Sequence, residues 1–296
     1  METPLTGKTY IVTGATSGIG LAAAEQLAGR GSFLIGVGRS SERCTAAEAR
    51  LRSAYPQAKV VYCVADLSMQ AQVHSLAGEI RQQMALHKAR SLDGLINNAG
   101  TFTYKMTITP EGFETQWAVN HLAPFLLTHE LLPLLKIAPA ARVVTVSSGS
   151  HYNTHLNWKD IQLRRGYNCL LAYKQTKLAN VLFTAELNRR LGAASTVRAF
   201  AADPGLVKTE IGFKGNPALV RWIWNVRQSS GVSAEQSARG VVYLATEPSI
   251  QTSPDIYWKD GQSRPPSPYA LDENVAHRLW DLSEQMCGIG SGTFSE

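Results

Sequence analysis

Cysteine, charge and long hydrophobic runs are all scarce in this sequence, and each shortage excludes a class of protein. The 296 residues include 4 cysteines, which lie far apart and form no Cys-x-x-Cys pair. That spacing argues against a disulfide framework, so we expect reduced, mostly buried thiols. No apolar stretch approaches the roughly 20 residues of a membrane-spanning helix. The N-terminus also lacks the basic start and apolar segment of a signal peptide, so we expect a soluble, cytoplasmic protein.

Charged residues make up only 18% of the chain, and the basic ones are scattered. Although 29 Lys and Arg outnumber 23 Asp and Glu, they gather in no run longer than pairs such as Arg164-Arg165. A nucleic-acid-binding protein usually concentrates its basic residues in one stripe or patch. We therefore expect no nucleic-acid partner. The 44% of hydrophobic residues, in contrast, is enough for a large core.

Short apolar runs alternate with longer helical segments along the chain. The expected strands cover residues 9–13, 32–37, 59–64, 92–97, 142–147 and 196–201, and the expected helices cover 20–30, 45–55, 70–86, 112–135 and 173–191. Near-continuous apolar strands separated by helices predict an α/β fold of the Rossmann type, a doubly wound parallel sheet covered on both faces.

Neither an internal repeat nor a flexible linker divides the sequence, which predicts a single domain over residues 1–296. Its dinucleotide-binding part would cover about 5–150, its catalytic and substrate part about 151–260, and a C-terminal tail 261–296. From residue 255 onward the chain is rich in proline, and apolar residues at helical spacing follow near its end. A short terminal helix is expected there.

A glycine-rich turn joins the first expected strand to the first expected helix. The candidate cofactor-binding residues in it are Gly14, Thr16, Ser17, Gly18, Ile19 and Gly20. The first glycine permits a tight turn, and the later two let backbone and helix end approach a pyrophosphate. Glycine after a strand is also common in ordinary turns, so a purely structural turn is the alternative.

The end of the second expected strand indicates which dinucleotide binds. An acidic residue there would bind the ribose 2′-hydroxyl, whereas a cation would hold a 2′-phosphate. Arg39 occupies this place and no acid precedes Glu42, with Ser17 or Ser40 as further hydroxyl donors. This favours NADP(H) over NAD. In the alternative, Arg39 is a solvated surface side chain and the protein uses NAD.

Polar and small residues follow the third and fourth expected strands, where ligands bind in open α/β sheets. Asp66 precedes Leu67, and its carboxylate could accept a hydrogen bond from an adenine amino group or cap the next helix. Asn98, Ala99 and Gly100 would let the backbone pass close to a ribose.

Tyr173 and Lys177 form the strongest single signal. Residues four apart lie on one helical face, so the Lys177 ammonium can stand beside the Tyr173 phenol. Acid–base work near neutral pH needs a tyrosine pKa about three units below its usual value of about 10. An adjacent ammonium and an oxidised nicotinamide would both lower it. Ser148 ends a strand 25 residues upstream of Tyr173 and could hydrogen-bond the substrate oxygen.

Together these motifs resemble the short-chain dehydrogenase/reductase family over essentially the whole chain. The residues that carry the resemblance are the glycine turn, Asn97-Asn98-Ala99-Gly100, Ser148, Tyr173, Lys177 and Asp203-Pro204-Gly205. Residues 119–128 and 176–183, with Arg278-Leu279-Trp280, resemble the retinol dehydrogenase-like branch. Members of that branch often begin with a membrane anchor, whereas here the first strand comes almost at once.

The resemblance implies roles for individual residues. Tyr173 would be the acid/base, Ser148 would orient the carbonyl, Lys177 would bind the nicotinamide ribose and lower the pKa of Tyr173, and Asn120 would hold a proton-relaying water. Cofactor contacts would also come from Pro204, Gly205, Val207 and Thr209. Asp203 stands where the family usually has another residue, and the sequence suggests no role for it.

Two further features invite a functional interpretation. His151 and His155 lie four residues apart, but no Cys or acidic pattern joins them, so we expect no metal site. Residues 206–231 form an apolar insert with Trp222 and Trp224, which we interpret as a lid over an apolar substrate. Plain packing, a subunit interface or a peripheral membrane contact are the alternatives.

The sequence therefore predicts an NADP(H)-dependent oxidoreductase that moves a hydride between nicotinamide and a carbonyl or alcohol. The apolar insert favours a bulky small-molecule substrate that is retinoid-, steroid- or aromatic-like. A second hypothesis is an NAD(P)-binding sensor or scaffold without turnover. A homodimer is expected from base rates alone.

Overall fold

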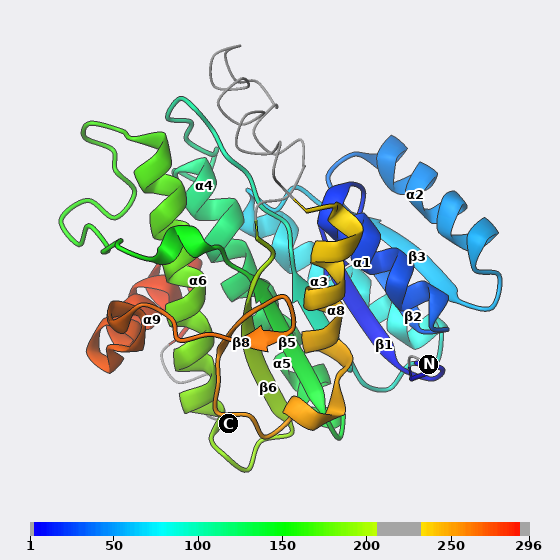
Figure 1. Cartoon of the computed structure of the whole chain (residues 1–296). Coiled ribbons are helices and arrows are strands. Elements are labelled where there is room, and N and C mark those ends of the chain that lie inside the picture. The colour runs from blue at the N-terminus through cyan, green and yellow to red at the C-terminus, as the bar shows by residue number, and fades with distance from the viewer. Residues whose placement is uncertain (1–2, 206–231, 291–296) are drawn as a thin grey trace.

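One eight-stranded sheet organises the molecule. The computed structural model describes residues 3–205 and 232–290, and its sheet has the order β3-β2-β1-β4-β5-β6-β7-β8 (Figure 1). The strands are β1 Thr9–Thr13, β2 Phe33–Gly38, β3 Lys59–Val64, β4 Gly94–Asn97, β5 Ala141–Val146, β6 Val197–Asp203, β7 Tyr257–Lys259 and β8 Gln262–Ser263. All neighbours pair in parallel except β7 and β8, which are antiparallel. The predicted doubly wound α/β fold is confirmed.

Helices cover both faces of this sheet. The α-helices are α1 Gly18–Gly29, α2 Ser41–Ala54, α3 Gln70–Leu86, α4 Thr115–Trp117, α5 Ala123–Ile137, α6 Cys169–Leu191, α8 Ala234–Thr246 and α9 Glu273–Cys287. The shorter turns are η1 Ala118–Leu122, which is π-helical, and the 3-10 turns η2 Gly149–His151, η4 Pro248–Ile250 and η5 Pro268–Leu271. Buried residues of α1, α2 and α8 share one apolar core, and those of α3, α5, α6 and α9 share the other.

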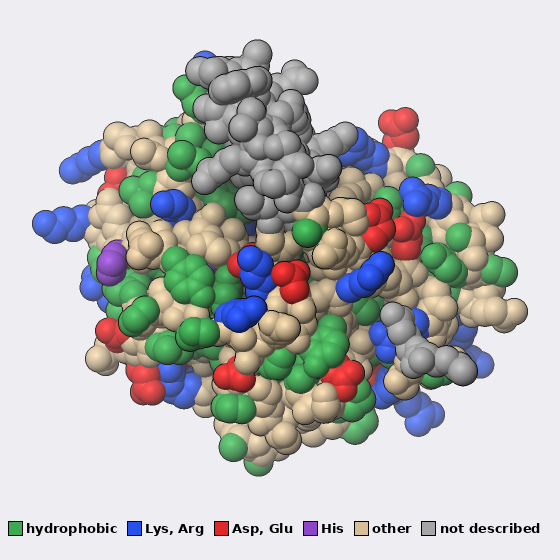
Figure 2. All heavy atoms as spheres, viewed as in Figure 1, with side chains coloured by type: hydrophobic (Ala, Val, Ile, Leu, Met, Phe, Trp, Pro, Cys, Tyr) green, Lys and Arg blue, Asp and Glu red, His purple; other side chains and the backbone are tan. Residues whose placement is uncertain are grey.

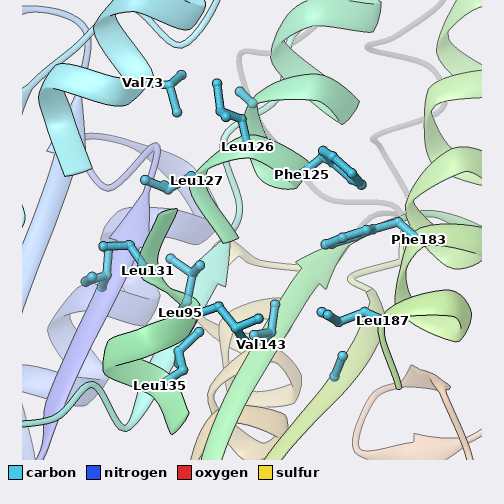
Figure 3. Close-up of a cluster of buried hydrophobic side chains, with 14 of the residues drawn as sticks. Val73, Leu95, Phe125, Leu126, Leu127, Leu131, Leu135, Val143, Phe183 and Leu187 are labelled. Atoms are coloured by element: carbon cyan, nitrogen blue, oxygen red, sulfur yellow. The ribbon is translucent and has the colours of Figure 1, made fainter. Parts of the chain in front are cut away.

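The two cores explain why the central strands are apolar throughout. Successive strand residues point to opposite faces, so Leu95 joins the core under α3 and α5, while Ile96 joins the core under α1 and α8. Val143 and Val144 of β5 divide in the same way. Figure 3 shows Leu95 and Val143 packed among leucine side chains of α5. A strand that is buried on both faces has no polar side, which is why no alternation is visible in the sequence.

Of the five predicted helices, four begin two to four residues away from the expected start, and two of these shifts have a clear cause. Helix α6 starts at Cys169, one turn before Tyr173, because the side chain of Asn168 accepts hydrogen bonds from the backbone N–H groups of Leu170 and Leu171. The helix expected over residues 112–135 starts only at Thr115, since Gly112 has a φ of +85° and belongs to a turn. By contrast, the predicted bounds 59–64 and 70–86 match β3 and α3.

The proline-rich stretch after residue 255 also contains a strand. β7 pairs in parallel with β6, and its Tyr257 and Trp258 are both buried. A strand of three residues is too short for a period to be visible, so β7 could not be predicted from the sequence. The expected terminal helix is present as α9.

Charges of both signs are interspersed on the face shown in Figure 2, and no basic stripe crosses it. No helix among the described residues is long and apolar enough to cross a membrane. Strands β1 and β4 are neighbours in the sheet, but the helices that follow them, α1 and α5, cover opposite faces. In open α/β sheets, ligands bind at the carboxyl ends of two such strands.

Candidate active site

The glycine turn is packed so tightly that side chains would not fit. Gly14 and Gly18 have φ values of +68° and +55°, which favour glycine. A Cβ atom on Gly20 would lie 2.3 Å from the carbonyl oxygen of Gly14 and 2.4 Å from Nδ2 of Asn98. Ser17 precedes α1 and makes no side-chain cap to it, so the first backbone N–H groups of α1 are available to an anion. This cradle fits the pyrophosphate of a dinucleotide.

Asn98 has a structural task that the sequence did not reveal. Its Nδ2 donates to the carbonyl oxygen of Thr13 at 2.8 Å, while the backbone N–H groups of Asn98 and Ala99 both donate to Oγ1 of Thr13 at 3.0 Å. The end of β4 is thereby tied to the end of β1. Gly100 lies beyond this clamp, and a Cβ atom there would be 3.5 Å from Oδ1 of Asn120 and 3.8 Å from Nζ of Lys177.

The region after β2 presents a positively charged group to solvent. Arg39 is exposed directly after Gly38, and its side chain has no hydrogen bond or ion pair within residues 3–205 and 232–290. Ser40 instead caps α2, since its hydroxyl accepts from the backbone N–H of Arg43. The methyl group of Thr16 packs against Gly38, where a Cβ atom would approach it to 2.5 Å. Arg39 therefore remains available to a ligand.

Asp66 lies in the turn after β3 but does not cap α3. Its carboxylate accepts from the backbone N–H of Ser68 at 3.0 Å. The carboxylate of Glu111, which is distant in sequence, accepts instead from the first N–H groups of α3, at Gln70 and Ala71. The capping alternative for Asp66 is therefore wrong, and its predicted contact with adenine stays a prediction. Leu67 is partly buried against the apolar core.

The two serines after β5 are directed to different partners. Ser147 is buried and donates its hydroxyl to the carbonyl oxygen of Lys177 at 2.7 Å, which fixes α6 to the strand end. Ser148 interacts through its side chain with Tyr173, and it also accepts from the backbone N–H of Ser150. Ser148 is thus the hydroxyl that faces the candidate acid/base, as the sequence predicted.

Both ring nitrogens of His151 are already engaged. Nδ1 lies 2.9 Å from the carbonyl oxygen of Ser148, and Nε2 accepts from the backbone N–H of Ser267 at 3.1 Å. His155 packs edge-on against Tyr269. Across the described ranges, no group of three His, Cys, Asp or Glu residues could hold a metal ion. Through its contacts with Ser148 and Ser267, His151 anchors the Ser148 loop to the C-terminal region.

Tyr173 is surrounded by groups that keep its phenol protonated. Phe102 packs edge-to-face on its ring at 5.9 Å. Burial and the Asp203 carboxylate raise the pKa of Tyr173 to about 12, although the Ser148 side chain lowers it. Lys177 is not among the groups that shift this pKa, and burial and the negative charge of Asp203 raise it, so the lowering that we predicted from Lys177 is wrong for the protein without its cofactor.

Lys177 is buried beside Tyr173. Its Nζ lies 5.5 Å from the centre of the Tyr173 ring and donates to the carbonyl oxygen of Val146 at 3.0 Å. Burial lowers the pKa of Lys177 to about 8, while Asp203 raises it. The expected placement of the two side chains on one helical face is confirmed by this geometry.

Asn120 sits in a π-helical turn that periodicity could not reveal. Its Nδ2 donates to the carbonyl oxygen of Thr101 and to Oγ1 of Thr176, while its Oδ1 accepts from the backbone N–H of Thr101 at 2.7 Å. Turns of this kind are rare and occur often at functional sites. Its predicted water-holding role stays a prediction.

The end of β6 completes the cluster and supplies a residue without a predicted role. Asp203 is buried and accepts from the Tyr257 hydroxyl at 2.7 Å. Gly205 has a φ of +73°, and the carbonyl oxygen of Pro204 accepts from Ser237. The sequence showed Asp203 but no role for it, because its partner Tyr257 comes from a strand that was not predicted. Val207, Thr209 and the insert 206–231 lie outside the described residues.

Comparisons with known proteins agree on one family. A model of the short chain dehydrogenase family matches residues 8–218. Retinol dehydrogenase 14 of Mus musculus is 37% identical over 295 residues, which cover 96% of this chain and 86% of the mouse protein. Retinol dehydrogenase 13 of Homo sapiens is 36% identical over 300 residues, or 98% of this chain and 87% of the human protein.

Solved structures are similar as well. A protein of uncharacterised function from Mycobacterium paratuberculosis has 33% identity and a TM-score of 0.72, and the match covers 97% of this chain and 96% of that one. A short chain dehydrogenase from Pseudomonas syringae has 25% identity and a TM-score of 0.65, with 86% and 94% of the two chains covered.

Proposed function

Since this chain belongs to the short-chain dehydrogenase family, and is therefore an oxidoreductase, we propose that it transfers a hydride between NADP(H) and the carbonyl or alcohol group of a bulky apolar substrate. The retinol dehydrogenase-like resemblance found in its motifs is confirmed. The observation that carries the proposal is the meeting of Ser148, Tyr173 and Lys177 at the carboxyl edge of the sheet, beside the glycine cradle.

Each of these residues has a distinct task in carbonyl reduction. When bound, the nicotinamide supplies the hydride. Tyr173 gives its phenolic proton to the carbonyl oxygen, and the Ser148 hydroxyl stabilises the charge that develops on that oxygen. Lys177 holds the nicotinamide ribose, and the cradle around Gly14 and Gly20 receives the pyrophosphate.

Arg39 supports NADP(H) as the cofactor, because it places an exposed guanidinium after β2, where the adenosine 2′-phosphate would lie. We expect Arg39→Ala to weaken NADPH binding about 10- to 100-fold, the value of a charge-assisted hydrogen bond, and to leave NADH binding unchanged. Arg50→Ala is the control, since Arg50 is a further exposed arginine of the same region and pairs with Glu25. Equal losses for both dinucleotides in Arg39→Ala would contradict the assignment.

Apolar side chains around Tyr173 support a bulky apolar substrate. Phe102 contacts the Tyr173 ring, and the Gln116 amide donates to the carbonyl oxygens of both Thr103 and Cys169. The segments 103–104 and 169–170 are thereby held together, and Tyr104 and Leu170 are both exposed. Two relatives bear the name retinol dehydrogenase, which agrees with a substrate of this kind.

The first experiment is an assay of NADPH consumption by the purified protein with a panel of apolar aldehydes and ketones, retinal included. NADH is tested alongside. Turnover with NADPH establishes the reaction, and the ranking of substrates outlines the pocket. Tight NADPH binding without turnover on any member would favour a sensor or scaffold instead.

Other expectations from the sequence stay predictions. They concern the cytoplasmic location, the homodimer and the interpretation of residues 206–231 as a lid, with a peripheral membrane contact among its alternatives. Fractionation of cells and sedimentation of the purified protein would test them.

A further inference from the structure

Asp203 places a carboxylate inside the site without giving it a cationic partner. It is the last residue of β6 and is 7% exposed. Its Oδ2 accepts from the Tyr257 hydroxyl at 2.7 Å, and its Oδ1 accepts from the backbone N–H of Gly205 at 2.9 Å. Both donors are neutral. Within residues 3–205 and 232–290, Asp203 forms no ion pair, so its charge acts on the groups around it at longer range.

Those groups come from every element packed against the carboxylate. Ala202, which precedes Asp203, pairs with Val146, and the carbonyl oxygen of Val146 accepts from Nζ of Lys177, so Asp203 ends its strand beside the Tyr173–Lys177 pair. Its charge acts on Tyr173 and Lys177 of α6, on His151 and Tyr152 after β5, and on Tyr257 of β7. A Cβ atom on Gly149 would lie 3.3 Å from Oδ2 of Asp203, which places the carboxylate directly beside the Ser148 loop. The exposed Lys259 of β7 lies beside the Gly205 turn.

A buried negative charge favours the protonated form of every neighbouring acid or base. It therefore opposes both proton losses of the Tyr173–Lys177 pair, whichever residue loses its proton first. It raises the pKa of the Tyr173 phenol, and it raises the pKa of Lys177 against the lowering by burial.

We propose that Asp203 is a positioning residue whose carboxylate holds Tyr173 as the phenol and Lys177 as the ammonium. These are the forms needed for carbonyl reduction, in which the phenolic O–H bond breaks and the proton passes to the carbonyl oxygen as the hydride reaches the carbon. This inference rests on the proposed function and deepens it: the site is poised for reduction rather than for alcohol oxidation at neutral pH.

The test is Asp203→Asn, which preserves the size of the side chain and removes the charge; its amide oxygen can still accept from Gly205, and its NH2 group can donate to the Tyr257 hydroxyl oxygen. The rate of carbonyl reduction falls at high pH, where the phenol is lost. We expect this fall to move to lower pH by about one unit or more in the variant. Alcohol oxidation, which needs the phenolate, should rise at correspondingly lower pH. Tyr257→Phe is the matched control, since it removes a hydrogen bond to the carboxylate but keeps the charge.

A second measurement does not depend on turnover. In protein labelled with ¹³C at Cζ of tyrosine, the Tyr173 resonance is identified by its absence in Tyr173→Phe. We expect it to begin its change to the phenolate position at lower pH in Asp203→Asn than in the wild type. If the substrate panel shows no turnover at all, the proposed function fails while this titration still decides the role of Asp203.

The outcomes separate charge from structure. A shift in Asp203→Asn that is absent in Tyr257→Phe supports the proposal. An unchanged pH profile and an unchanged Tyr173 titration, accompanied only by a lower melting temperature, would overturn it and leave Asp203 as a residue that fixes the turn to β7. Equal shifts in both variants would overturn it too, because loss of packing would then explain them.

Discussion

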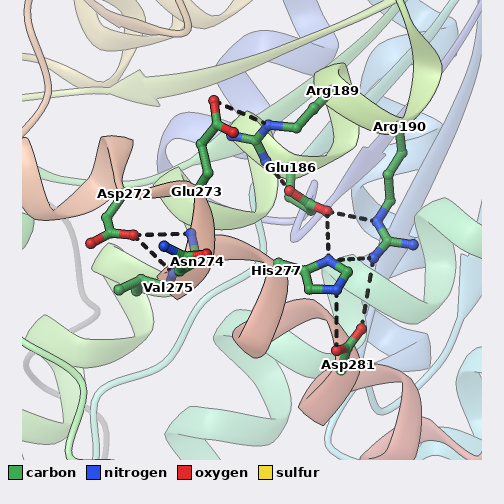
Figure 4. Close-up of polar contacts among 9 residues, drawn as sticks. All are labelled: Glu186, Arg189, Arg190, Asp272, Glu273, Asn274, Val275, His277 and Asp281. Atoms are coloured by element: carbon green, nitrogen blue, oxygen red, sulfur yellow. Dashed lines mark hydrogen bonds and ion pairs between the residues drawn. The ribbon is translucent and has the colours of Figure 1, made fainter.

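Helix α6 carries two polar clusters, and they are built in opposite ways. Near its N-terminal end, Tyr173 and Lys177 face the edge of the sheet together with Asp203. Near its C-terminal end, Glu186 lies between Arg189 and Arg190, and helix α9 adds further charges (Figure 4). The same helix thus serves a candidate reaction at one end and the attachment of another helix at the other.

In the C-terminal cluster every charge has a partner. The Glu186 side chain is 4% exposed, and its carboxylate accepts from Nε of Arg190 at 2.8 Å and from Nη1 of Arg189. The Arg190 guanidinium lies 4.5 Å from the centre of the Trp280 ring, which stacks on Phe183. This arrangement fixes α9 against α6.

In the site cluster the charges are less well compensated. Lys177 donates to a carbonyl oxygen rather than to a carboxylate, and burial lowers its pKa to about 8. Perturbed groups of this kind are typical of functional sites. The comparison indicates that the site cluster gives up stability to keep proton-transferring groups, whereas the cluster on α9 adds stability.

The largest expected effect is on turnover. Tyr173→Phe removes the proton that the carbonyl oxygen receives, so we expect the reduction rate to fall by about 1,000-fold. NADPH binding and the melting temperature should change little, because the ring remains. Stopped-flow or steady-state NADPH consumption measures the rate, and Tyr152→Phe is the control, since the Tyr152 hydroxyl donates to the carbonyl oxygen of Pro265. Retained turnover would remove Tyr173 from the mechanism.

The second prediction concerns the stability given up at Lys177. Its pKa is about 8 in the folded chain against 10.5 for an ordinary lysine, so the unfolded state binds more protons between these values. The contribution of Lys177 to the free energy of unfolding should therefore rise with pH in this window, and its penalty below about pH 8 is about 3 kcal/mol. Lys177→Met should relieve it, because Val146 still accepts a hydrogen bond from Asn180.

Urea unfolding at pH 7 and at pH 10 measures this effect. Lys177→Met should be more stable than the wild type at pH 7, and this difference in the free energy of unfolding should shrink at pH 10. Lys174→Met is the control, since Lys174 lies three residues before Lys177 on α6 and is exposed. A destabilised Lys177→Met at pH 7 would contradict the idea that this end of α6 gives up stability.

The third prediction has the opposite sign and belongs to the other cluster. Glu186→Gln removes the buried carboxylate that accepts from both Arg189 and Arg190, and we expect the free energy of unfolding to fall by about 2–3 kcal/mol. The pH profile of the reaction should not move, since the cluster lies at the far end of α6. Thermal unfolding and the pH dependence of turnover decide this together. A shifted profile would show that the two clusters are coupled.

The smallest effect should come from the outer part of that cluster. The Asp281 side chain is 57% exposed and meets Arg190 at 3.7 Å and His277 at 3.6 Å. Exposed pairs contribute little, so Asp281→Asn should change the free energy of unfolding by less than about 0.5 kcal/mol. A loss as large as that of Glu186→Gln would mean that the whole network acts as one unit.

Much of the site could be predicted because its signals are local. The glycine turn shows itself by residue type, and Tyr173 and Lys177 by a spacing of four on a helix. The π-helical turn that holds Asn120 could not be predicted, because Asn120 bonds to the backbone of Thr101 and to the side chain of Thr176, which are distant in sequence. The capping of α3 by Glu111 rather than by Asp66 was missed for the same reason.

By itself, the sequence determined the parallel sheet and the residues that face one another within a single turn or helix, since these follow from apolar periodicity and short spacing. Its motifs carried the resemblance to the family. The tertiary structure alone decided the proton balance of the site. Asp203 and Tyr257 lie 54 residues apart, and only the pairing of β6 with β7 brings them together beside Tyr173 and Lys177. A pKa depends on burial and on charges brought close by folding, and neither can be obtained from residue order.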